Sequence, residues 1–422
     1  MSDVTNTNAA AWPKRPLGDI FRISGDQVSP MAFSKAEFVH YSIPAWDATG
    51  GPAIELGNQI ESNKTAILDA SVLVSKLNPR KPRVVAVPAP TARTCCSTEF
   101  ICYQPKRASE DLSFWAAYFA STDFSGRLAR IAVGSTNSHT RASPKETLKW
   151  LVPEVPPHEQ RKIAQVLDLL NSTIHETEAI VAKLKTVKQG LLHDLLTRGI
   201  DANGELRPPQ SEAPHLYKQS PLGWIPKEWE AWPLAKSIQL VSGQHIPSEL
   251  CNIVGKGVPY FTGPSDFLGA STVVTQYTNY PQIMCDAGDI LITVKGSGCG
   301  KVAVASVRAC ISRQLMAIKV PHSTLQYWLA VFQNQQELLN RLATGGNIPG
   351  ISRTQILNLT LPTPRSANEM SEIGDRICTL DSQLVAEQQF LEKLRLQRAG
   401  LMDDLLTGRV RVTPLLQEAQ YA

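Results

Sequence analysis

One segment of the chain contains residue types that could bind a nucleotide phosphate. Lys295-Gly296-Ser297-Gly298-Cys299-Gly300-Lys301 has the glycine density of a phosphate-binding loop, in which backbone amides surround the phosphates and a lysine neutralises them. The match fails at two positions. Val302 stands where a Ser or Thr would hold magnesium, and Lys295 stands where the first glycine is required. We therefore interpret the segment as a tight turn into a strand, whose backbone can approach a ligand closely.

Two further segments resemble catalytic motifs only in part. His158-Glu159 lacks the second histidine, four residues later, that a zinc hydrolase needs. Asn78-Pro79-Arg80 lacks the second proline and the aromatic ring of the Asn-Pro-Pro-aromatic motif of adenine methyltransferases. No serine, cysteine or carboxylate constellation recurs with a suitable base. The sequence predicts recognition without chemistry, with no catalytic residues and no metal ligands.

The distribution of charge is more informative than its total. The chain has 42 basic and 38 acidic residues, a net charge of only +4. Residues 71–107, however, contain seven Lys or Arg against one acid, and residues 295–313 contain four basic residues and no acid. A basic stretch is often only a solvated surface, but one that recurs at matching places indicates a surface that neutralises phosphates.

The chain repeats itself with a lag of 210 residues. Residues 163–196 align without a gap on residues 373–406, and identical residues at the matched positions include the Gly-Leu pair at 190 and 400 and the Asp-Leu-Leu run at 194 and 404. In both copies, alternate steps of four and three residues from Ile163 or Ile373 give eight apolar positions out of ten. A spacing of 3.5 residues is typical of helices that pair lengthwise.

We therefore predict two helices of roughly 40 residues, each about 60 Å long, that pair with each other in antiparallel orientation. The alternative is that each helix packs only on its own domain. Proline-rich segments precede both helices, at residues 151–157 and 361–364, and Gly199 is suited to cap the first helix. Residues 201–226 show no periodicity and read as a linker.

The residues before each helix form the larger globular parts. Short β-branched runs predict strands at Ser71–Ser75, Val84–Val87, Asp289–Thr293, Lys301–Val307 and Leu315–Val320. Phe114–Phe119 and Tyr327–Phe332 occupy matching places and read as helix. The fold class is α/β (α+β), with two similar globular domains joined by an antiparallel coiled coil in an internal pseudo-two-fold repeat. We expect domain 1 at 1–157, the first helix at 158–199, a linker at 200–230, domain 2 at 231–365, the second helix at 366–407 and a tail at 408–422.

The eight cysteines show no paired spacing, so we expect them to be reduced and mostly buried. Residues 1–16 are polar and lack the apolar core of a signal peptide, and no run of 18 apolar residues occurs. We expect a cytoplasmic protein.

This arrangement resembles the specificity subunit of type I restriction-modification enzymes. The similar motifs are Pro156–Ala164 at the start of the first helix, Gly190–Thr197 at its end, Gly288–Thr293 in the second globular part, and Pro221–Pro226 before it. Each motif is weak alone, but their order and doubling make the match specific. The second copy departs from the pattern, because Ser366–Met370 replaces the expected Pro-Pro-x-Glu-Gln and only Glu369 remains.

The resemblance implies two target-recognition domains, each reading one half of a split, asymmetric DNA sequence, with the helix pair fixing the gap. It also implies that two modification subunits, which hold S-adenosylmethionine and methylate adenine, dock on the repeats. Two restriction subunits driven by ATP, with Mg expected on the partners, can join them. The chain itself would need no cofactor.

Candidate DNA contacts are basic or amide residues, with a few small polar ones, in loops that flank strands. They are Lys76, Arg80, Lys81, Arg83, Asn137, Ser138, His139 and Arg141 in the first domain, and Lys295, Ser297, Lys301, Arg313, Gln314, Asn347, Ser352 and Arg353 in the second. Candidate partner contacts at the helix starts are Glu159, Gln160, Arg161 and Glu369. For the two acids the plainer explanation is a favourable helix dipole.

Two other functions are compatible with the sequence. A structural adaptor that binds only proteins would explain the helices and the lack of catalytic groups, but not the doubled basic stretches. A self-contained nuclease or methylase would show turnover by the chain alone.

Overall fold

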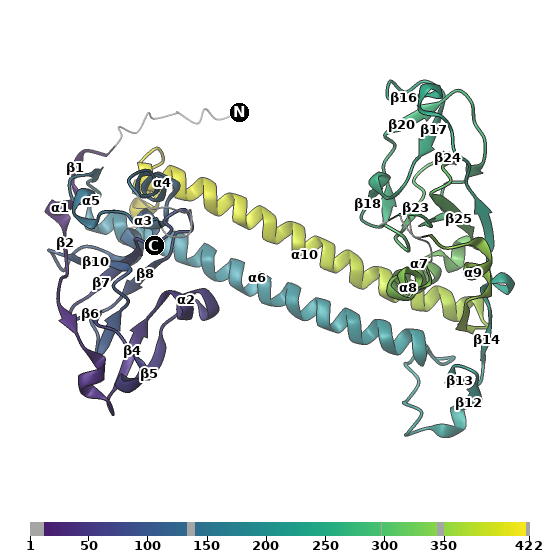
Figure 1. The fold of residues 1–422 in the computed structure, drawn as a ribbon, viewed down its shortest axis with the longest axis horizontal. Helices are drawn as coiled ribbons and strands as arrows, with labels where there is room; N and C mark the ends of the chain where they lie inside the picture. Colours follow the sequence, from purple (N-terminus) through teal and green to yellow (C-terminus); the bar gives the residue numbers. More distant parts are fainter. Residues whose placement is uncertain (1–11, 133–139, 297, 344–349, 419–422) are drawn as a thin grey trace. The chain divides into compact units, whose positions relative to one another are not determined.

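The computed structural model describes residues 12–132, 140–296, 298–343 and 350–418. The chain divides into two compact units, one formed by residues 1–178 and 389–422 and the other by residues 179–388. Two long helices, α6 (Pro157–Thr197) and α10 (Ala367–Thr407), each contribute one half to each unit (Figure 1). Each has 41 residues, which confirms the predicted length.

The first unit contains a globular part, residues 12–156, that we call the first head. Its strands are β1 (Lys14–Pro16), β2 (Phe21–Ile23), β3 (Gln27–Val28), β4 (Glu37–Tyr41), β5 (Ala53–Leu56), β6 (Lys64–Ala66), β7 (Ser71–Ser75), β8 (Val84–Val87), β9 (Thr94–Cys96), β10 (Phe100–Pro105) and β11 (Leu151–Pro153). Its helices are α1 (Leu17–Ile20), α2 (Ile43–Thr49), α3 (Leu112–Ala120), α4 (Thr122–Arg130) and α5 (Pro144–Thr147). The strands form sheets in the orders β2-β10-β7-β8, β3-β6-β9-β4-β5 and β1-β11.

The second unit contains the second head, residues 200–366. Its strands are β12 (Tyr217–Ser220), β13 (Gly223–Pro226), β14 (Trp229–Pro233), β15 (Gln239–Ser242), β16 (Cys251–Asn252), β17 (Val258–Phe261), β18 (Phe267–Leu268), β19 (Ser271–Thr272), β20 (Gln276–Thr278), β21 (Met284–Cys285), β22 (Ile290–Thr293), β23 (Val302–Val304), β24 (Ala309–Ile311), β25 (Leu315–Lys319) and β26 (Thr360–Pro364). Its helices are α7 (Leu325–Asn334), α8 (Gln336–Leu342) and α9 (Arg353–Asn358), and a short helix α11 (Thr413–Glu418) follows α10 in the first unit.

The two heads share a sheet topology. The order β15-β25-β22-β23 in the second head corresponds to β2-β10-β7-β8 in the first, with the same antiparallel pairings. In the second sheets, β17 pairs in parallel with β24 as β4 does with β9. The predicted strands are therefore present, although Lys301–Val307 forms a ladder only at Val302–Val304.

Aromatic side chains fill the equivalent cores. Trp115 in α3 is fully buried and packs edge-on against Phe21, with ring centroids 5.2 Å apart. Its counterpart Trp328 in α7 is also buried, beside Tyr327 at 5.3 Å. Because buried aromatics contribute large apolar areas, these residues fix the matching helices against their sheets.

The seam predicted from the heptad spacing is the contact between α6 and α10 in each unit. In the first unit, Ile163 at the start of α6 shares a hydrophobic cluster with Leu405 at the end of α10. Ile174 packs with Leu391 and Leu394 farther along. Antiparallel pairing in this unit is thus confirmed. None of the seam positions of either helix is exposed.

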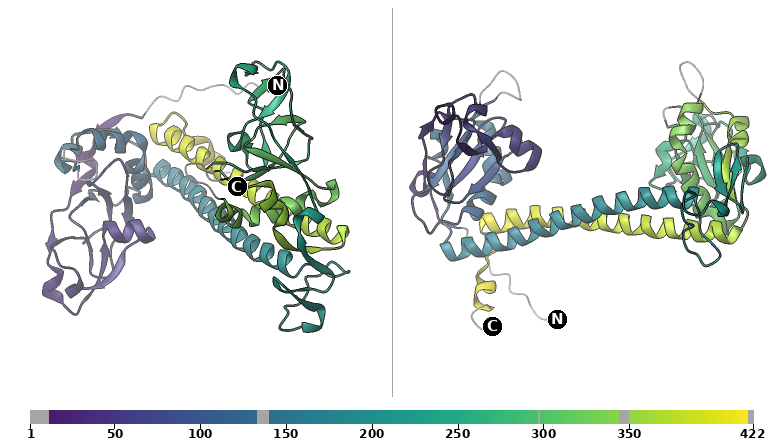
Figure 2. Two further views of the ribbon diagram at one scale, coloured as in Figure 1. Left: turned by 45° about the vertical axis from the view of Figure 1, so that its right-hand side comes forward. Right: turned by 90° about the horizontal axis from the view of Figure 1, so that it is seen from below.

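In the second unit the pairing continues between the other halves of the two helices. Leu195 of α6 belongs to the same hydrophobic cluster as Ile373 and Ile377 of α10. Lys188 also forms an ion pair with Asp381. Figure 2 shows the two helices side by side within each unit.

The segment after α6, which we predicted to be a linker, contains regular structure. Residues 217–226 form a hairpin of β12 and β13, in which Gly223 adopts a φ of 96° at the turn. The strands are only four residues long, too short to show a period in the sequence.

Of the eight cysteines, all are free thiols and six are buried, as expected. Within the described ranges, none of the helices combines the length and apolar character that crossing a membrane requires.

Candidate nucleic-acid interface

Three loops meet beside the main sheet of the second head. The amide of Val294, just after β22, donates to the carbonyl of Gln314 at 2.8 Å. The amide of Ile351 donates to the carbonyl of Val294 at 2.9 Å, and Lys295 forms a β-bridge with Gly350. These bonds bring together loops that are widely separated in the sequence. We call this arrangement the second loop junction.

The first head contains the same junction, built from equivalent loops. The amide of Lys76, just after β7, donates to the carbonyl of Glu99 at 2.9 Å. The amide of Ala142 donates to the carbonyl of Lys76 at 3.1 Å, and Leu77 forms a β-bridge with Arg141. The backbone pattern is conserved between the heads, whereas the side chains differ. The two junctions therefore share a backbone frame and differ in the side chains that they present.

In the second head the junction collects most of the predicted DNA contacts. Lys295, Lys301 and Arg313 are exposed and lie in or beside its loops. Gln314 is exposed too, and the Ser352 hydroxyl caps α9 by accepting from the Gln355 amide at 3.2 Å. Arg353 is exposed at the next position. Ser297 and Asn347 lie outside the described residues.

In the first head, Arg83 and Lys81 share one internal carboxylate partner. Arg83 is only 8% exposed and donates twice to the Asp47 carboxylate, at 2.8 and 2.7 Å. The hydrogen bond from Arg83 is the main cause that lowers the pKa of Asp47 to about 2. Lys81 lies 3.3 Å from the same carboxylate. Arg83 therefore has a structural role, because its guanidinium is buried and paired, and we correct its assignment as a DNA contact.

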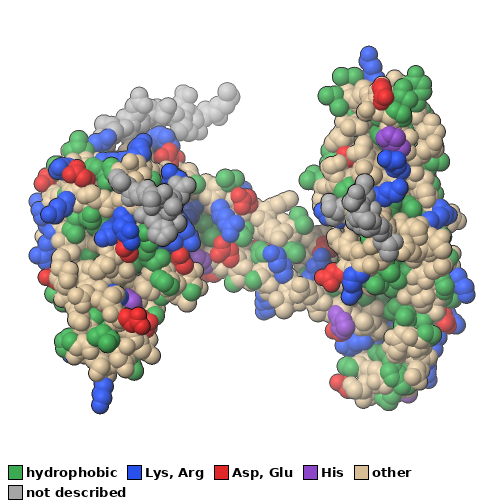
Figure 3. All heavy atoms as spheres, viewed as in Figure 1, with side chains coloured by type: hydrophobic (Ala, Val, Ile, Leu, Met, Phe, Trp, Pro, Cys, Tyr) green, Lys and Arg blue, Asp and Glu red, His purple; other side chains and the backbone are tan. Residues whose placement is uncertain are grey.

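The remaining predicted contacts of the first head lie around its junction. Arg141 is exposed and forms a bidentate pair with Glu99, with distances of 3.0 and 3.1 Å. Lys76 is half-buried and Arg80 is exposed. Asn137, Ser138 and His139 lie outside the described residues. Figure 3 shows Lys and Arg side chains on the face of the first head that it displays.

A polar pocket beside the second junction contains residues that sequence analysis missed. It has a volume of about 480 Å³ and is lined by Arg313 and Gln314 together with His245 and Gln276. His245 comes from the loop after β15 and Gln276 from β20, so nothing in their sequence spacing relates them. The nearest signal is Gly243, where a Cβ atom would lie 2.2 Å from the Ser312 carbonyl oxygen. Because glycine has no side chain, the loop after β15 can lie this close to Ser312.

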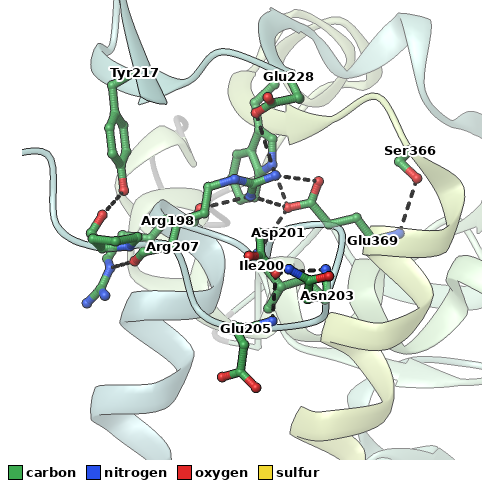
Figure 4. Close-up of polar contacts among 12 residues, drawn as sticks. Arg198, Ile200, Asp201, Asn203, Glu205, Arg207, Tyr217, Glu228, Ser366 and Glu369 are labelled. Atoms are coloured by element: carbon green, nitrogen blue, oxygen red, sulfur yellow. Dashed lines mark hydrogen bonds and ion pairs between the residues drawn. The ribbon is translucent and has the colours of Figure 1, made fainter. Parts of the chain in front are cut away.

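The predicted partner contact Glu369 is buried instead of exposed (Figure 4). Its carboxylate accepts from Arg207 Nη1 at 2.5 Å, from Trp229 Nε1 at 2.9 Å and from the Ile200 amide at 3.1 Å. Gly199, with a φ of +63°, leaves space for this group, since a Cβ there would lie 2.3 Å from Glu369 Oε1. We call this set the second clamp, because it holds the start of α10 to the segment after α6.

An equivalent set, the first clamp, holds the start of α6. Glu159 is buried and accepts from Arg411 at 2.6 and 3.1 Å. The Arg411 guanidinium lies 3.7 Å from the centre of the Trp12 ring. Gly408 has a φ of +75° and contacts Trp12. In the first unit the segment after α10 therefore binds the glutamate at the start of α6, as the segment after α6 binds the glutamate at the start of α10 in the second unit.

The fully buried Gln160 stands next to the first clamp. Its side chain donates to Glu110 at 2.9 Å and accepts from the Asp111 amide at 2.8 Å. Glu159, Gln160 and Glu369 therefore stabilise the chain itself, and we correct their assignment as surface contacts with partners. Of the four predicted residues only Arg161 is exposed.

Among the described residues, no group of three or more His, Cys, Asp or Glu side chains could hold a metal ion.

Comparison with known families agrees with this geometry. Residues 226–396, which contain most of the second head and the first three quarters of α10, match the family model of the type I restriction modification DNA specificity domain. The chain is similar to proteins named as type I restriction enzyme specificity subunits.

Two relatives come from Methanocaldococcus jannaschii. The chain is 28% identical over 273 residues to a protein named as the MjaX specificity subunit, and 22% identical over 288 residues to the MjaVIII specificity subunit. Each match covers 63% of this chain. The chain spans 60% and 63% of the length of these relatives, which is less than two thirds.

Solved structures show the same fold over nearly the whole chain. The HsdS subunit from Thermoanaerobacter tengcongensis is 21% identical, with a TM-score of 0.50, and the match covers 97% of this chain and all of that one. The type I S subunit from M. genitalium is 15% identical, with a TM-score of 0.58 and coverage of 95% and 97%. At these identities the likeness establishes the fold alone.

Proposed function

We propose that this chain is the DNA-recognition subunit of a type I restriction-modification complex. Each head reads one half of a bipartite, asymmetric DNA target, and the helix pair sets the unread gap. The chain performs no catalysis itself. The observation that carries the proposal is the match of residues 226–396 to a DNA specificity domain, in a chain whose first head repeats the loop junction of the second.

The side chains at the junctions support recognition of DNA. Exposed Lys and Arg can contact phosphates and set the register on the duplex, while Arg and Gln can read guanine and adenine edges, at about 1–3 kcal/mol per good pair. Equivalent positions differ, since Glu99 in the first head corresponds to Gln314 in the second. The Arg141–Glu99 pair in the first head and the exposed Gln314 amide in the second present different groups to base edges. Different half-sites follow, and hence an asymmetric target.

The helix pair suits the role of a ruler. A helix of 41 residues extends about 60 Å, whereas successive turns of B-DNA repeat every 34 to 36 Å. The clamps fasten each head to a helix start through buried charged groups, so that the head and the rod move together.

The partners that we propose are those that the family resemblance implies. We propose that two modification subunits, which carry S-adenosylmethionine, dock on the repeats, and that restriction subunits using ATP and Mg can join. Adenine methylation and DNA cleavage would then belong to these partners. A complex that acts on chromosomal DNA would work in the cytoplasm.

Selection from a pool of random duplexes, with the modification partner present, tests the proposal. Enrichment of a motif made of two specified parts and a fixed gap is the expected result. Selection without any enriched motif would favour an adaptor that binds proteins only. Methylation by the purified chain alone would contradict its role as a subunit without catalysis.

A further inference from the structure

Each long helix has a basic side chain at a seam position that the heptad pattern would fill with an apolar residue. These residues are Lys188 in α6 and Arg398 in α10, which are related by the repeat of 210 residues. A second basic pair, Lys185 and Arg395, recurs one turn earlier. A cation within an apolar seam gives up hydrophobic packing, so its presence in both copies requires an explanation.

Ion pairing within the chain does not explain the recurrence. Lys188 pairs with Asp381, and Arg395 pairs with Glu178 at 2.7 Å. The position that corresponds to Asp381 in the other copy is Asn171, and the one that corresponds to Glu178 is Gln388. The cations recur, but their acidic partners do not.

The other two cations make no ion pair with any residue that the structure describes. They are Lys185, which is exposed, and Arg398, which is half-buried. Surface salt bridges also contribute only about 0–1 kcal/mol each. The recurrent feature is therefore positive charge that is available to something outside the chain.

Each unit has a groove that is lined by two of these four cations. The first groove has a volume of about 890 Å³ and lies between α10 and the corner where α3 meets α4. Its lining includes Arg395 and Arg398 of α10, and Ser121, Asp123 and Arg127 of the corner. The second groove has a volume of about 840 Å³ and lies between α6 and the corner where α7 meets α8. Its lining includes Lys185 and Lys188 of α6, and Asn334, Gln336 and Asn340 of the corner. The lining contains four basic and two acidic residues in the first groove, and two basic and one acidic in the second. Both grooves are positive.

Each groove adjoins the loop that carries candidate DNA contacts. Pro82, in the loop of the first head that carries Arg80 and Lys81, lines the first groove. In the second head, a Cβ atom on Gly300, next to Lys301, would lie 3.2 Å from the Gln336 carbonyl oxygen and 3.6 Å from Asn340 Oδ1. In each head, a loop with candidate DNA contacts therefore borders the groove.

We propose that these grooves hold phosphates of the duplex, so that the helix pair grips the DNA backbone next to each half-site without reading its bases. The inference rests on the proposed DNA-recognition function and names a further contact for the same partner. DNA explains why the basic pair recurs in both copies, because the phosphate groups of a duplex are the same whatever its base sequence. The basic pair can therefore recur while the reading side chains diverge.

The test uses the full-length chain and a duplex of random sequence, with binding measured as a function of salt concentration. In the variant K185Q/R398Q, two cations without ion pairs are neutralised, so that the known contacts of the fold remain. Each lost phosphate contact lowers the slope of log affinity against log salt by about 0.9. We expect the slope to fall by about 1.8, while the sequence preference found by selection stays unchanged.

The matched control is K183Q/K393Q. These lysines also recur with the 210-residue lag and are exposed on the same helices, but neither lines a groove. The control removes the same charge and is expected to leave the slope close to that of the unmodified chain.

Three results would overturn the inference. If the unmodified chain binds DNA and both variants show its slope, the grooves are not phosphate sites, and the proposed function still stands. If K185Q/R398Q keeps its slope but no longer co-purifies with the modification subunit, the grooves serve a protein partner. If the unmodified chain, alone and with its partner, binds no duplex, the proposed function fails and the inference fails with it.

Discussion

The second clamp predicts a large local effect from a small chemical change, Glu369→Gln. The substitution keeps the size of the side chain but removes the charge that faces Arg207, whose side chain is only 8% exposed. Removing one partner of a buried ion pair costs about 3–5 kcal/mol. Glu228, whose carboxylate lies 3.6 Å from Arg207 and is largely exposed, remains as a weaker partner, so we expect a cost toward the lower end of this range. The cost falls on the contact between the start of α10 and the segment after α6.

The assay is hydrogen exchange of the amides in residues 199–207, which respond to local opening of this contact. Because 1.4 kcal/mol corresponds to a factor of about ten, exchange there should accelerate by roughly two to three orders of magnitude. Glu205→Gln is the control, since Glu205 is exposed and makes no ion pair among the described residues.

A graded comparison comes from the first clamp. In Glu159→Gln the unpaired guanidinium would be that of Arg411, which is 30% exposed and better solvated. Its effect should be smaller than that of Glu369→Gln. If Glu369→Gln accelerated exchange no more than Glu205→Gln, the clamp would not be what fastens the second head.

Three further predictions concern the reading loops and the backbone. Lys301→Ala and Arg80→Ala should each weaken DNA binding and reduce the slope of log affinity against log salt by about 0.9. Unchanged binding would show that Lys301 and Arg80 lie outside the interface. Arg83→Gln should instead lower the unfolding midpoint of the first head. The pairing with Arg83 lowers the pKa of Asp47 in the folded state to about 2, from 3.8. This pairing should therefore stabilise the first head fully above about pH 4, and the stabilisation should be lost as pH falls through 2. An NMR titration in which the Asp47 carboxyl has a pKa near 4 would contradict this. Gly199→Ala should destabilise the second unit by more than the roughly 1 kcal/mol of an ordinary left-handed site, because the added methyl group meets Glu369; thermal unfolding that matched the unmodified chain would show that the segment can shift.

The duplication could be predicted from the sequence because the two copies align with one constant lag of 210 residues. The helix pair could be predicted because apolar residues recur in both copies with a constant spacing of 3.5 residues. Eight of ten apolar positions in each seam leave little choice of packing partner, and the structure buries or half-buries all of them. Strands such as Ser71–Ser75 were predictable for a similar reason, since a β-branched run buried on both faces is a local signal.

The clamps could not be predicted because they join residues without a local relation. Arg411 and Glu159 are 252 positions apart, and a helix-start glutamate has a sufficient local explanation in the helix dipole. Arg83 shows the same limit, since its partner Asp47 lies in α2 and not in the basic stretch. Charge alone does not distinguish a buried structural cation from an exposed one that can contact DNA.

The most direct test of the central claim is a genome-wide map of methylated adenine in a host with and without this chain. Two heads that read two half-sites predict that methylation dependent on the chain falls on one asymmetric motif, made of two specified parts separated by a gap of constant length. Methylation at a single uninterrupted motif, or at two half-sites with a variable gap, would contradict the account.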